Sequence, residues 1–127
     1  MRELTKAEEQ IMMILWDLEK GFVKDILERF PEPRPAYNTV STITRILQEK
    51  GFVSHKSYGR SHQYYPLISK SEYSKRTIKN LVSNYFSDSF HEMVSFFAKE
   101  KDLSVGEMEE IMKIMSREIE NKGRKER

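Results

Sequence analysis

The chain has 127 residues, a length that suits one small domain with an assembly element and leaves no room for a large catalytic cleft beside a second core. Charged residues make up 33% of the chain, yet the formal net charge is only +2, so total charge does not point to a nucleic-acid partner. The absence of cysteine excludes disulfides and thiolate chemistry, and no apolar run approaches the roughly 18 residues of a membrane span, which predicts a soluble, cytoplasmic protein.

Residues 5–30 predict two helices. Thr5-Lys6-Ala7-Glu8 fits a capping box, in which the Thr hydroxyl and the Glu carboxylate accept hydrogen bonds from amides at the helix start. The apolar face of this first helix, which ends at Gly21, consists of Ala7, Ile11, Ile14, Leu15 and Leu18. A second helix is expected over residues 23–30, and it ends at Pro31 because proline cannot continue helical hydrogen bonding.

Residues 36–51 predict a short helix whose two faces differ. One face is apolar at helical spacing: Val40, Ile43, Ile46 and Leu47. The opposite face carries short hydrogen-bonding groups and one long cation: Asn38, Ser41, Thr42 and Arg45. An ordinary surface helix favours Glu, Lys and Ala at such positions, so this face is typical of a helix that reads a DNA groove. A solvated face that happens to be rich in Ser and Thr is the alternative.

The segment after this helix predicts a basic β-hairpin. Residues 52–58 and 61–67 are aromatic and β-branched enough for strands, and Gly59 between them allows a tight turn. Residues 34–68 carry five Lys or Arg against one Glu, a balance of +4, whereas residues 1–33 have a balance of −3. The positive charge is therefore local to the third helix and the hairpin.

Three helices followed by a two-stranded ribbon predict a winged helix-turn-helix over residues 1–68 of a mainly α chain. In that fold the third helix enters the major groove and reads base edges, while the hairpin lies along the adjacent phosphates. The predicted DNA-binding residues are Tyr37, Asn38, Thr39, Ser41, Thr42 and Arg45 on the helix, and Lys56, Tyr58 and Arg60 on the hairpin.

Residues 69–127 predict an all-α dimerisation region of three helices, with Ser69 or Ser71 as the first cap and Ser104 as the cap of the third. Their apolar stripes exceed what short helices can bury alone, which favours a twofold partner surface. The predicted dimerisation residues are Leu81, Val82, Tyr85, Phe86, Phe90, Met93, Val94, Phe97, Met108, Ile111, Met112 and Met115. The alternative is that this stripe packs back on the N-terminal domain. Residues 122–127 are expected to form a frayed charged tail.

The histidines give little support for catalysis. His55, His62 and His91 fall in no metal-ligand spacing such as HExxH, and there is no Gly-x-Ser-x-Gly motif. His55 and His62 could face each other across the hairpin, as a polar strand pair or a phosphate contact. We therefore predict no enzymatic activity, no metal and no cofactor. A winged helix that serves as a protein-interaction module without a DNA role is the alternative function.

Four groups of residues form a spaced pattern within residues 4–73. They are Leu4-Thr5-Lys6-Ala7-Glu8 with Ile11-Met12 and Trp16, then Asn38-Thr39-Val40-Ser41-Thr42, then Lys50-Gly51-Phe52-Val53, and finally Tyr58-Gly59-Arg60 with Tyr64-Tyr65-Pro66-Leu67-Ile68. This pattern resembles the penicillinase repressor family (BlaI/MecI type), which is related to the copper-responsive CopY repressors. The resemblance implies a homodimeric transcriptional repressor on a palindromic DNA operator. The copper branch uses a cysteine-rich C-terminus, which this sequence lacks, so copper sensing is not expected.

The resemblance also implies a route of release. Antibiotic-responsive members are inactivated by cutting an Asn-Phe bond in the dimerisation region, and the similar stretch here is Val94-Ser95-Phe96-Phe97-Ala98-Lys99, with Phe96 in place of the Asn. The bond between Phe96 and Phe97 would then be the cleavage site, and a membrane-bound sensor protease would act on it indirectly. A packed aromatic pair is the other interpretation of these two residues. No sequence pattern identifies the operator, the regulated genes or the inducing signal.

Overall fold

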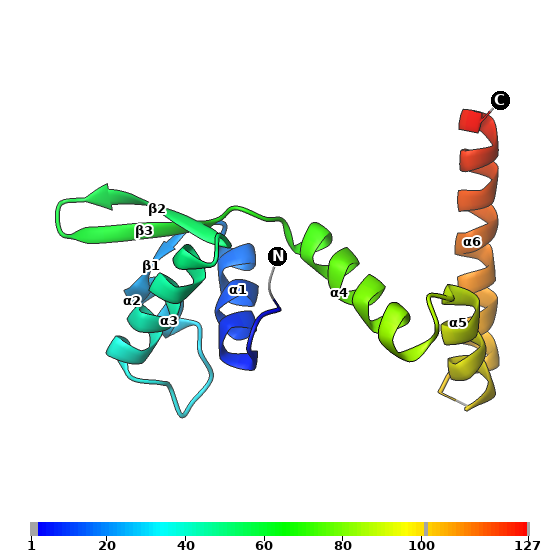
Figure 1. Cartoon of the computed structure of the whole chain (residues 1–127), viewed down its shortest axis with the longest axis horizontal. Coiled ribbons are helices and arrows are strands. Elements are labelled where there is room, and N and C mark those ends of the chain that lie inside the picture. Colours follow the sequence, from blue (N-terminus) through cyan, green and yellow to red (C-terminus); the bar gives the residue numbers. More distant parts are fainter. Residues whose placement is uncertain (1–2, 101, 127) are drawn as a thin grey trace. The chain divides into compact units, whose positions relative to one another are not determined.

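The computed structural model describes residues 3–100 and 102–126 (Figure 1). They form two compact units, which divide between Ile78 and Lys79. This division lies inside α4 (Lys70–Tyr85), so the start of that helix belongs to the first unit and its end to the second. The functional boundary predicted between residues 68 and 69 falls just before α4 and stays a prediction.

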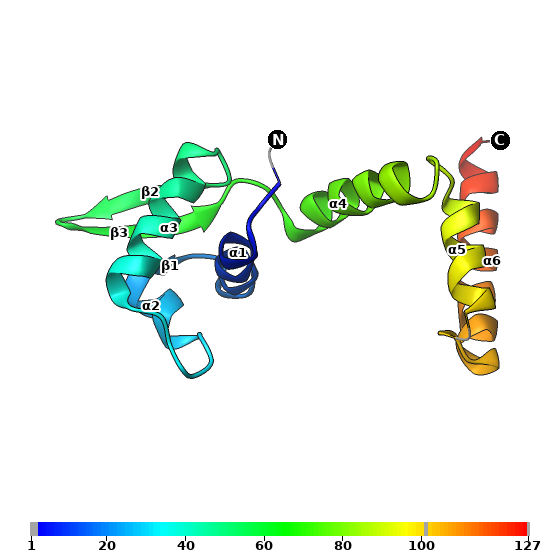
Figure 2. The same ribbon diagram turned by 60° about the horizontal axis from the view of Figure 1, so that its bottom comes forward.

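The first unit has three helices and a small antiparallel sheet, as the winged helix-turn-helix prediction requires. Its elements before α4 are α1 (Lys6–Leu18), β1 (Gly21–Phe22), α2 (Val23–Glu28), α3 (Tyr37–Glu49), β2 (Val53–Tyr58) and β3 (Ser61–Pro66). The tip of the β2–β3 hairpin extends beyond the helices (Figure 1 and Figure 2). The strand order is β1-β3-β2, which corrects the predicted two-stranded ribbon to three strands. The additional strand is very short, with Gly21 paired to Tyr64 and Phe22 to Gln63.

The capping box predicted at the start of α1 is confirmed. The Glu8 amide donates to Thr5 Oγ1 at 3.2 Å, and the Thr5 amide donates to Glu8 Oε1 at 2.8 Å. The buried apolar side chains of the helix are Ile11, Met12 and Leu15. Ala7, which the sequence pattern placed on the apolar face, is exposed instead, because the buried face of α1 is turned toward Met12.

The core of the first unit joins the helices to the sheet. It contains Ile11, Met12, Leu15, Val23, Ile26, Phe30, Val40, Leu47, Phe52, Val53, Tyr64, Ile68 and Tyr73. At its edge the Trp16 indole N–H donates to the Ile68 carbonyl at 2.9 Å, and the Trp16 ring centroid lies 5.7 Å from that of Tyr73. Because Tyr73 lies early in α4, these contacts fix the start of that helix to the first unit.

A glycine ends α3, as predicted. Gly51 has a φ of 86°, a conformation that other residues rarely adopt. Its amide donates to the Gln48 carbonyl at 3.0 Å, and the Phe52 amide donates to the Leu47 carbonyl at 2.9 Å. These two bonds satisfy carbonyls that the helix end would otherwise leave free, and the chain turns directly into β2 with Phe52 fully buried.

The second unit contains the end of α4, α5 (Phe90–Lys99) and α6 (Val105–Glu126). The chain breaks between α4 and α5 at Ser87 and Asp88, whose φ values are 50° and 61°. The hydroxyls of Ser89 and Ser104 accept hydrogen bonds at 3.1 Å from amides in the first turns of α5 and α6. Ser69 similarly caps α4. The three C-terminal helices and the caps Ser69 and Ser104 are therefore where the sequence predicted them, and the Ser89 cap was not predicted.

The frayed tail predicted from residue 122 onward is wrong, because α6 continues to Glu126. Arg124 pairs with Glu120 one turn earlier at 2.6 Å, and basic side chains in the last turn interact favourably with the negative end of the helix dipole. Arg127 lies outside the described residues. Across residues 3–100 and 102–126, no helix combines the length and the apolar character that crossing a bilayer would take.

Candidate nucleic-acid interface

α3 presents a buried face and an exposed polar face, as its sequence predicts. Val40, Thr44 and Leu47 are fully buried. The predicted DNA-binding residues that are exposed on this helix are Tyr37, Asn38, Thr39, Thr42 and Arg45, and Ser41 is half-buried. The polar side chains are thus available to a partner, while the apolar ones fix the helix to the core.

The buried face of α3 differs from the prediction at two positions. Ile46, expected in the core, is 36% exposed, and Thr44 is fully buried instead. The buried Thr44 hydroxyl is satisfied, because it donates a hydrogen bond to the Val40 carbonyl one turn earlier at 2.7 Å. The angle of the buried stripe depends on where α1 and the sheet contact α3, and a short sequence pattern does not contain that information.

A groove lies between α2, α3 and the hairpin. Tyr37, Ser41 and Arg45 of α3 line it together with Tyr58 and Arg60 of the hairpin. The structure therefore brings five of the nine predicted DNA-binding residues into one concave surface. The remaining four, which are exposed and lie outside this lining, are Asn38, Thr39, Thr42 and Lys56.

Three further basic or titratable residues outside the predicted DNA-binding set line the groove: Lys24, Arg34 and His62, the last of which the sequence offered either as half of a polar strand pair or as a phosphate contact. Arg34 is held in place because its Nε and Nη2 atoms donate to the Phe30 and Glu28 carbonyls, each at 3.3 Å. The local excess of positive charge in residues 34–68 could have predicted a DNA-binding role for Arg34. No sequence signal placed Lys24 beside α3, because α2 was predicted only as a packing element.

The groove lining carries a net positive charge. Its charged residues are the cations Lys24, Arg34, Arg45 and Arg60 and the carboxylates Asp25 and Glu28. One of the carboxylates has a structural role, because Asp25 Oδ2 accepts a hydrogen bond from the Phe22 amide at 2.9 Å at the start of α2. A surface with this balance attracts a polyanion such as the DNA backbone.

Tyr64 contributes no negative charge to this groove. Its side chain is 4% exposed, and burial raises the pKa of its phenol above the ordinary value. The nearby Arg45 guanidinium lowers this pKa, and Tyr37 raises it further. Because the net shift is upward, the phenol stays uncharged at neutral pH, and the positive potential around Arg45 is preserved.

The hairpin holds its own basic and aromatic side chains in place. The Tyr58 ring lies edge-on to that of Phe22, with centroids 5.8 Å apart, and Lys56 Nζ lies 5.4 Å from the Tyr58 ring centroid. Gly59 follows with a φ of 62°, which allows the tight turn before Arg60. The end of the hairpin therefore carries Lys56 beside the Tyr58 ring and Arg60 directly after Gly59.

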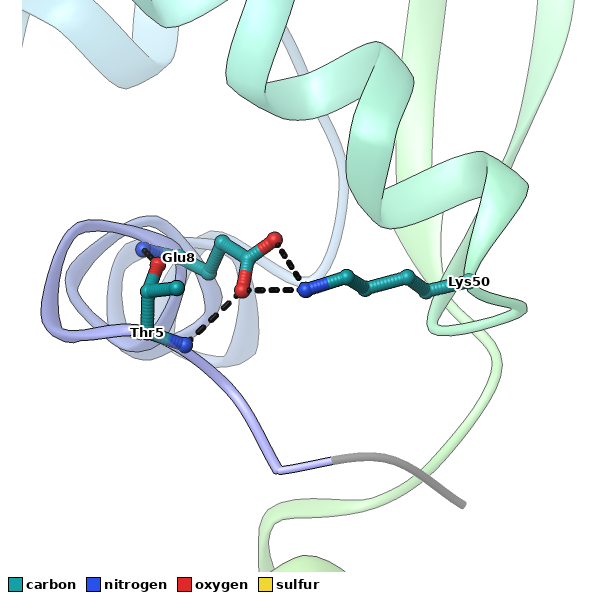
Figure 3. A network of polar contacts seen from close by, with 3 residues as sticks. All are labelled: Thr5, Glu8 and Lys50. Carbon is teal, nitrogen blue, oxygen red and sulfur yellow. Dashed lines mark hydrogen bonds and ion pairs between the residues drawn. The ribbon is translucent and has the colours of Figure 1, made fainter.

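A partly buried ion pair joins the end of α3 to the start of α1 (Figure 3). Lys50 Nζ lies 2.8 Å from Glu8 Oε1 and 2.7 Å from Oε2. Burial alone would raise the pKa of the Glu8 carboxyl, but hydrogen bonds from Lys50 and from Thr5 outweigh burial and lower that pKa below its ordinary value. The carboxylate is therefore charged at neutral pH, and the pair links two elements 42 positions apart in the sequence.

The second unit exposes most of the predicted dimerisation residues. Those that are exposed are Leu81, Tyr85, Phe90, Val94, Phe97, Ile111, Met112 and Met115. Phe86, Met93 and Met108 are half-buried, and Val82 is only 2% exposed, so little of its surface is available to a partner. Exposed apolar side chains that the predicted set did not include are Phe96, Val105, Ile114 and Ile119. An apolar surface on this scale is typical of an interaction site.

A winged helix-turn-helix with a polar third helix and a positively charged groove defines the chain as a protein of the DNA-binding class. More particularly, the chain belongs to the penicillinase repressor family, whose sequence model, described as "Penicillinase repressor", matches residues 4–117. This match confirms the family resemblance found in the sequence.

Relatives match over almost the whole chain. The methicillin resistance regulatory protein MecI of Mammaliicoccus sciuri is 29% identical over 116 residues, which cover 91% of this chain and 94% of the relative. The protein of the same name from Staphylococcus aureus (strain N315) is 28% identical with the same coverage. The penicillinase repressor of Bacillus licheniformis is 23% identical over 124 residues, which cover 97% of this chain and 94% of the relative.

Two solved structures match a little over half of the chain. The solution structure of the DNA-binding domain of the repressor BlaI has a TM-score of 0.49 and 24% identity, and the match covers 56% of this chain and 88% of that one. The CopR repressor structure has a TM-score of 0.45 and 29% identity, and the match covers 54% of this chain and all of that one.

Proposed function

We propose that this DNA-binding transcriptional repressor acts as a homodimer on a palindromic operator, with α3 reading base edges and the hairpin holding the phosphate backbone. The observation that carries the proposal is the shared groove, in which Ser41 and Arg45 of α3 face the same concave surface as Arg60 of the hairpin. Membership of the penicillinase repressor family supports repression as the outcome of binding. A chromosomal operator makes the cytoplasm the proposed place of action, and the proposal contains no enzymatic step.

The chemistry of the groove favours DNA over a protein partner. Arginine can bind a guanine edge through two hydrogen bonds, and hydroxyl side chains can contact either bases or phosphates. A winged helix that served only as a protein-interaction module would be expected to show an apolar groove without this excess of cations. Retention of the protein on a random-sequence duplex column at low salt, with release at high salt, is the expected result for DNA binding.

Replacement of Arg45 tests the assignment of α3 to base reading. We expect Arg45→Ala to weaken binding to the true operator by about 1–3 kcal/mol and to relax the preference at one base-pair position, because a bidentate arginine contact carries sequence information. The measurement is fluorescence anisotropy on an operator selected from genomic fragments and on a set of its single-base variants.

Arg60→Ala is the matched control, since it removes the same side chain from the hairpin. We expect it to weaken binding to operator and random duplexes equally and to reduce the salt dependence by about one phosphate contact. Equal losses on operator and random DNA for Arg45→Ala would reverse the assignment of that residue from base to backbone contact.

The proposed dimer is formed by the apolar residues of the second unit. Support comes from Met112 and Met115, which are 67% and 55% exposed on one side of α6, and from Phe97 of α5, which is 40% exposed. Burial of such side chains against an identical surface would remove apolar area from water in both protomers. Two winged helices joined in this way would engage two half-sites together, which is how the proposal links assembly to operator affinity.

We further propose that derepression follows when the part of the chain that includes α6 is separated from the winged helix. The family resemblance points to the bond between Phe96 and Phe97 as the cleavage site, with a membrane-bound sensor protease acting indirectly. The bond lies within α5, and the Phe96 ring is 5.7 Å from that of Phe86 and 5.6 Å from that of Phe97. Cleavage of a helical bond requires the helix to open locally first, so the rate would depend on the stability of α5.

Mass spectrometry of the repressor from cells exposed to a β-lactam tests this route. The expected result is a fragment that ends at Phe96, which lacks the apolar residues of α6 and so dimerises weakly. Phe96→Asn, which restores the Asn-Phe pair of the antibiotic-responsive members, should be cut at least as fast. An intact chain during full derepression would exclude proteolysis and point to a ligand or a partner.

A further inference from the structure

Two histidine rings are stacked on the hairpin. The ring centroids of His55 in β2 and His62 in β3 are 4.0 Å apart, and the ring planes differ by only 7°. The strand register explains the contact, because His55 pairs with Tyr64 and Ser57 pairs with His62, so the two histidines are diagonal neighbours on one face of the hairpin. The Tyr64 ring lies 5.6 Å from that of His55 and 6.2 Å from that of His62.

One ring of the stack is fixed by α3. His55 Nδ1 lies 2.7 Å from Gln48 Oε1, and an amide oxygen only accepts hydrogen bonds, so His55 donates from Nδ1. This bond joins the hairpin to the C-terminal half of α3. His62, which is exposed, lines the groove that Arg45 and Arg60 also line. The stack therefore has one anchored ring and one ring that faces the proposed DNA surface.

The geometry does not suit a metal ion. The lone pairs of an imidazole lie in the plane of its ring, so two rings stacked in parallel direct them side by side and not toward one point. Within residues 3–100 and 102–126, no three histidine, aspartate or glutamate side chains come together as a metal site would require. A ligand that approaches the edge of one ring, such as an oxyanion, fits the stack better.

Charged and polar groups face the stack from α2, α3 and the hairpin. The cations of the groove are Lys24, Arg34, Arg45 and Arg60, and they oppose a further positive charge on His62 in the free protein. The carboxylates Asp25 and Glu28 attract a positive charge in the groove. The phenols Tyr37, Tyr58 and Tyr64 also line the groove and are uncharged. Lys56 lies next to His55 in β2, and the alternation of a strand places it on the other face of the hairpin. Two positive rings 4.0 Å apart would repel each other, so the proposal below involves a single proton.

We propose that His62 is a phosphate-contact residue, positioned by His55, that takes up a proton when the DNA backbone enters the groove. The inference rests on the proposed DNA-binding function; it decides between the two interpretations that the sequence left open for this histidine pair and adds the coupled proton. A phosphodiester beside the ring supplies the negative charge that the imidazolium needs, and the proton comes from solvent. Histidine exchanges its proton between about pH 5 and pH 8, so DNA affinity should rise as the pH falls through this range.

The test is the affinity for a random-sequence 30-base-pair duplex, measured by fluorescence anisotropy at fixed salt between about pH 8 and pH 6. For the unmodified protein we expect affinity to increase about three- to tenfold over this range, as uptake of up to one proton allows. In His62→Gln the increase should disappear. In His62→Lys, which carries a permanent charge, the affinity at pH 8 should match that of the unmodified protein at pH 6, a gain that damage to the fold would not produce.

His91→Gln is the matched control. Because His91 lies in α5 of the second unit, its replacement should leave the pH dependence of DNA affinity unchanged. The same pH response in the unmodified protein and in His62→Gln would overturn the inference while leaving DNA binding intact. Loss of the response in His91→Gln would overturn it as well. A protein that binds no duplex at any pH would contradict the proposed function together with the inference.

Discussion

In Met112→Asp we expect the protein to sediment as a monomer and its affinity for the operator to fall about 100-fold or more. A carboxylate at position 112 would have no partner in a desolvated interface, and burying an unpaired charge costs several kcal/mol, which is enough to separate many dimers. The loss of operator affinity follows because a dimer holds its second winged helix near the second half-site, an advantage that a monomer lacks. Analytical ultracentrifugation and anisotropy on the selected operator measure the two effects.

Met112 gives a cleaner test than Phe86, the other position that the apolar pattern offers. Met112 is 67% exposed in the chain, whereas Phe86 is half-buried and its ring lies 5.7 Å from that of Phe96, so a charge there would also damage the second unit. Asn121→Asp is the matched control, because Asn121 is exposed and projects from the other side of α6. A Met112→Asp variant that still sediments as a dimer would show that the interface lies elsewhere.

The second large effect is expected from Lys50→Met. The Glu8 side chain is 5% exposed and that of Lys50 is 18% exposed, so the variant leaves a buried carboxylate without its partner. Removal of one member of such a pair costs about 3 kcal/mol, a large part of the stability of a small domain. Urea denaturation of the full chain at neutral pH measures the loss, and Lys56→Met, at an exposed lysine, serves as the control.

The loss of stability in Lys50→Met should depend on pH in a definite direction. In the unmodified protein the lowered pKa of Glu8 means that its carboxylate stabilises the fold above the unfolded-state pKa, and this contribution is lost as the pH falls through the folded-state pKa. Loss of Lys50 removes the largest of the contributions that lower this pKa, while burial continues to raise it, so Glu8 takes up a proton more readily than in the unmodified protein. The destabilisation should therefore be smaller near pH 4 than at pH 7.

The double variant Glu8→Gln/Lys50→Met separates the ion pair from other effects of losing the lysine. Because a neutral amide replaces the buried charge, the double variant should regain part of the stability that Lys50→Met loses. An equal loss in the single and the double variant would mean that the pair has little role, and that Lys50 acts through packing alone.

Local signals in the sequence predicted the elements that depend on nearby residues. The capping box joins Thr5 and Glu8, three positions apart, and Gly51 and Gly59 supply positive φ values at the end of α3 and in the hairpin turn. Each of these features is determined by a few consecutive residues. β1 was missed for the opposite reason, since two residues are too few to show a strand period and its pairing with β3 links residues more than 40 positions apart.

The parts of the site that sequence patterns did not contain depend on tertiary packing. The sequence pattern identifies Glu8 only as a helix-capping residue. Its ion pair with Lys50 joins residues that are 42 positions apart, which no local pattern can show. Lys24 and His62 are charged or titratable residues without a motif, and only the packing of α2 and the register of the hairpin bring them to the same groove as Arg45. Thr44 is buried where Ile46 was expected, because the neighbours of α3 set which side of the helix faces the core.

The most direct test of the account is nuclear magnetic resonance of the isotope-labelled full chain titrated with its selected operator duplex. The account predicts that backbone and side-chain signals shift along the exposed face of α3, at Ser41, Thr42 and Arg45, and along the hairpin from Lys56 to His62. Signals of exposed α1 residues that do not line the groove, such as Met13, should stay in place. Shifts concentrated in α5 and α6, with α3 and the hairpin unchanged, would contradict the assignment of the groove as the DNA-binding surface.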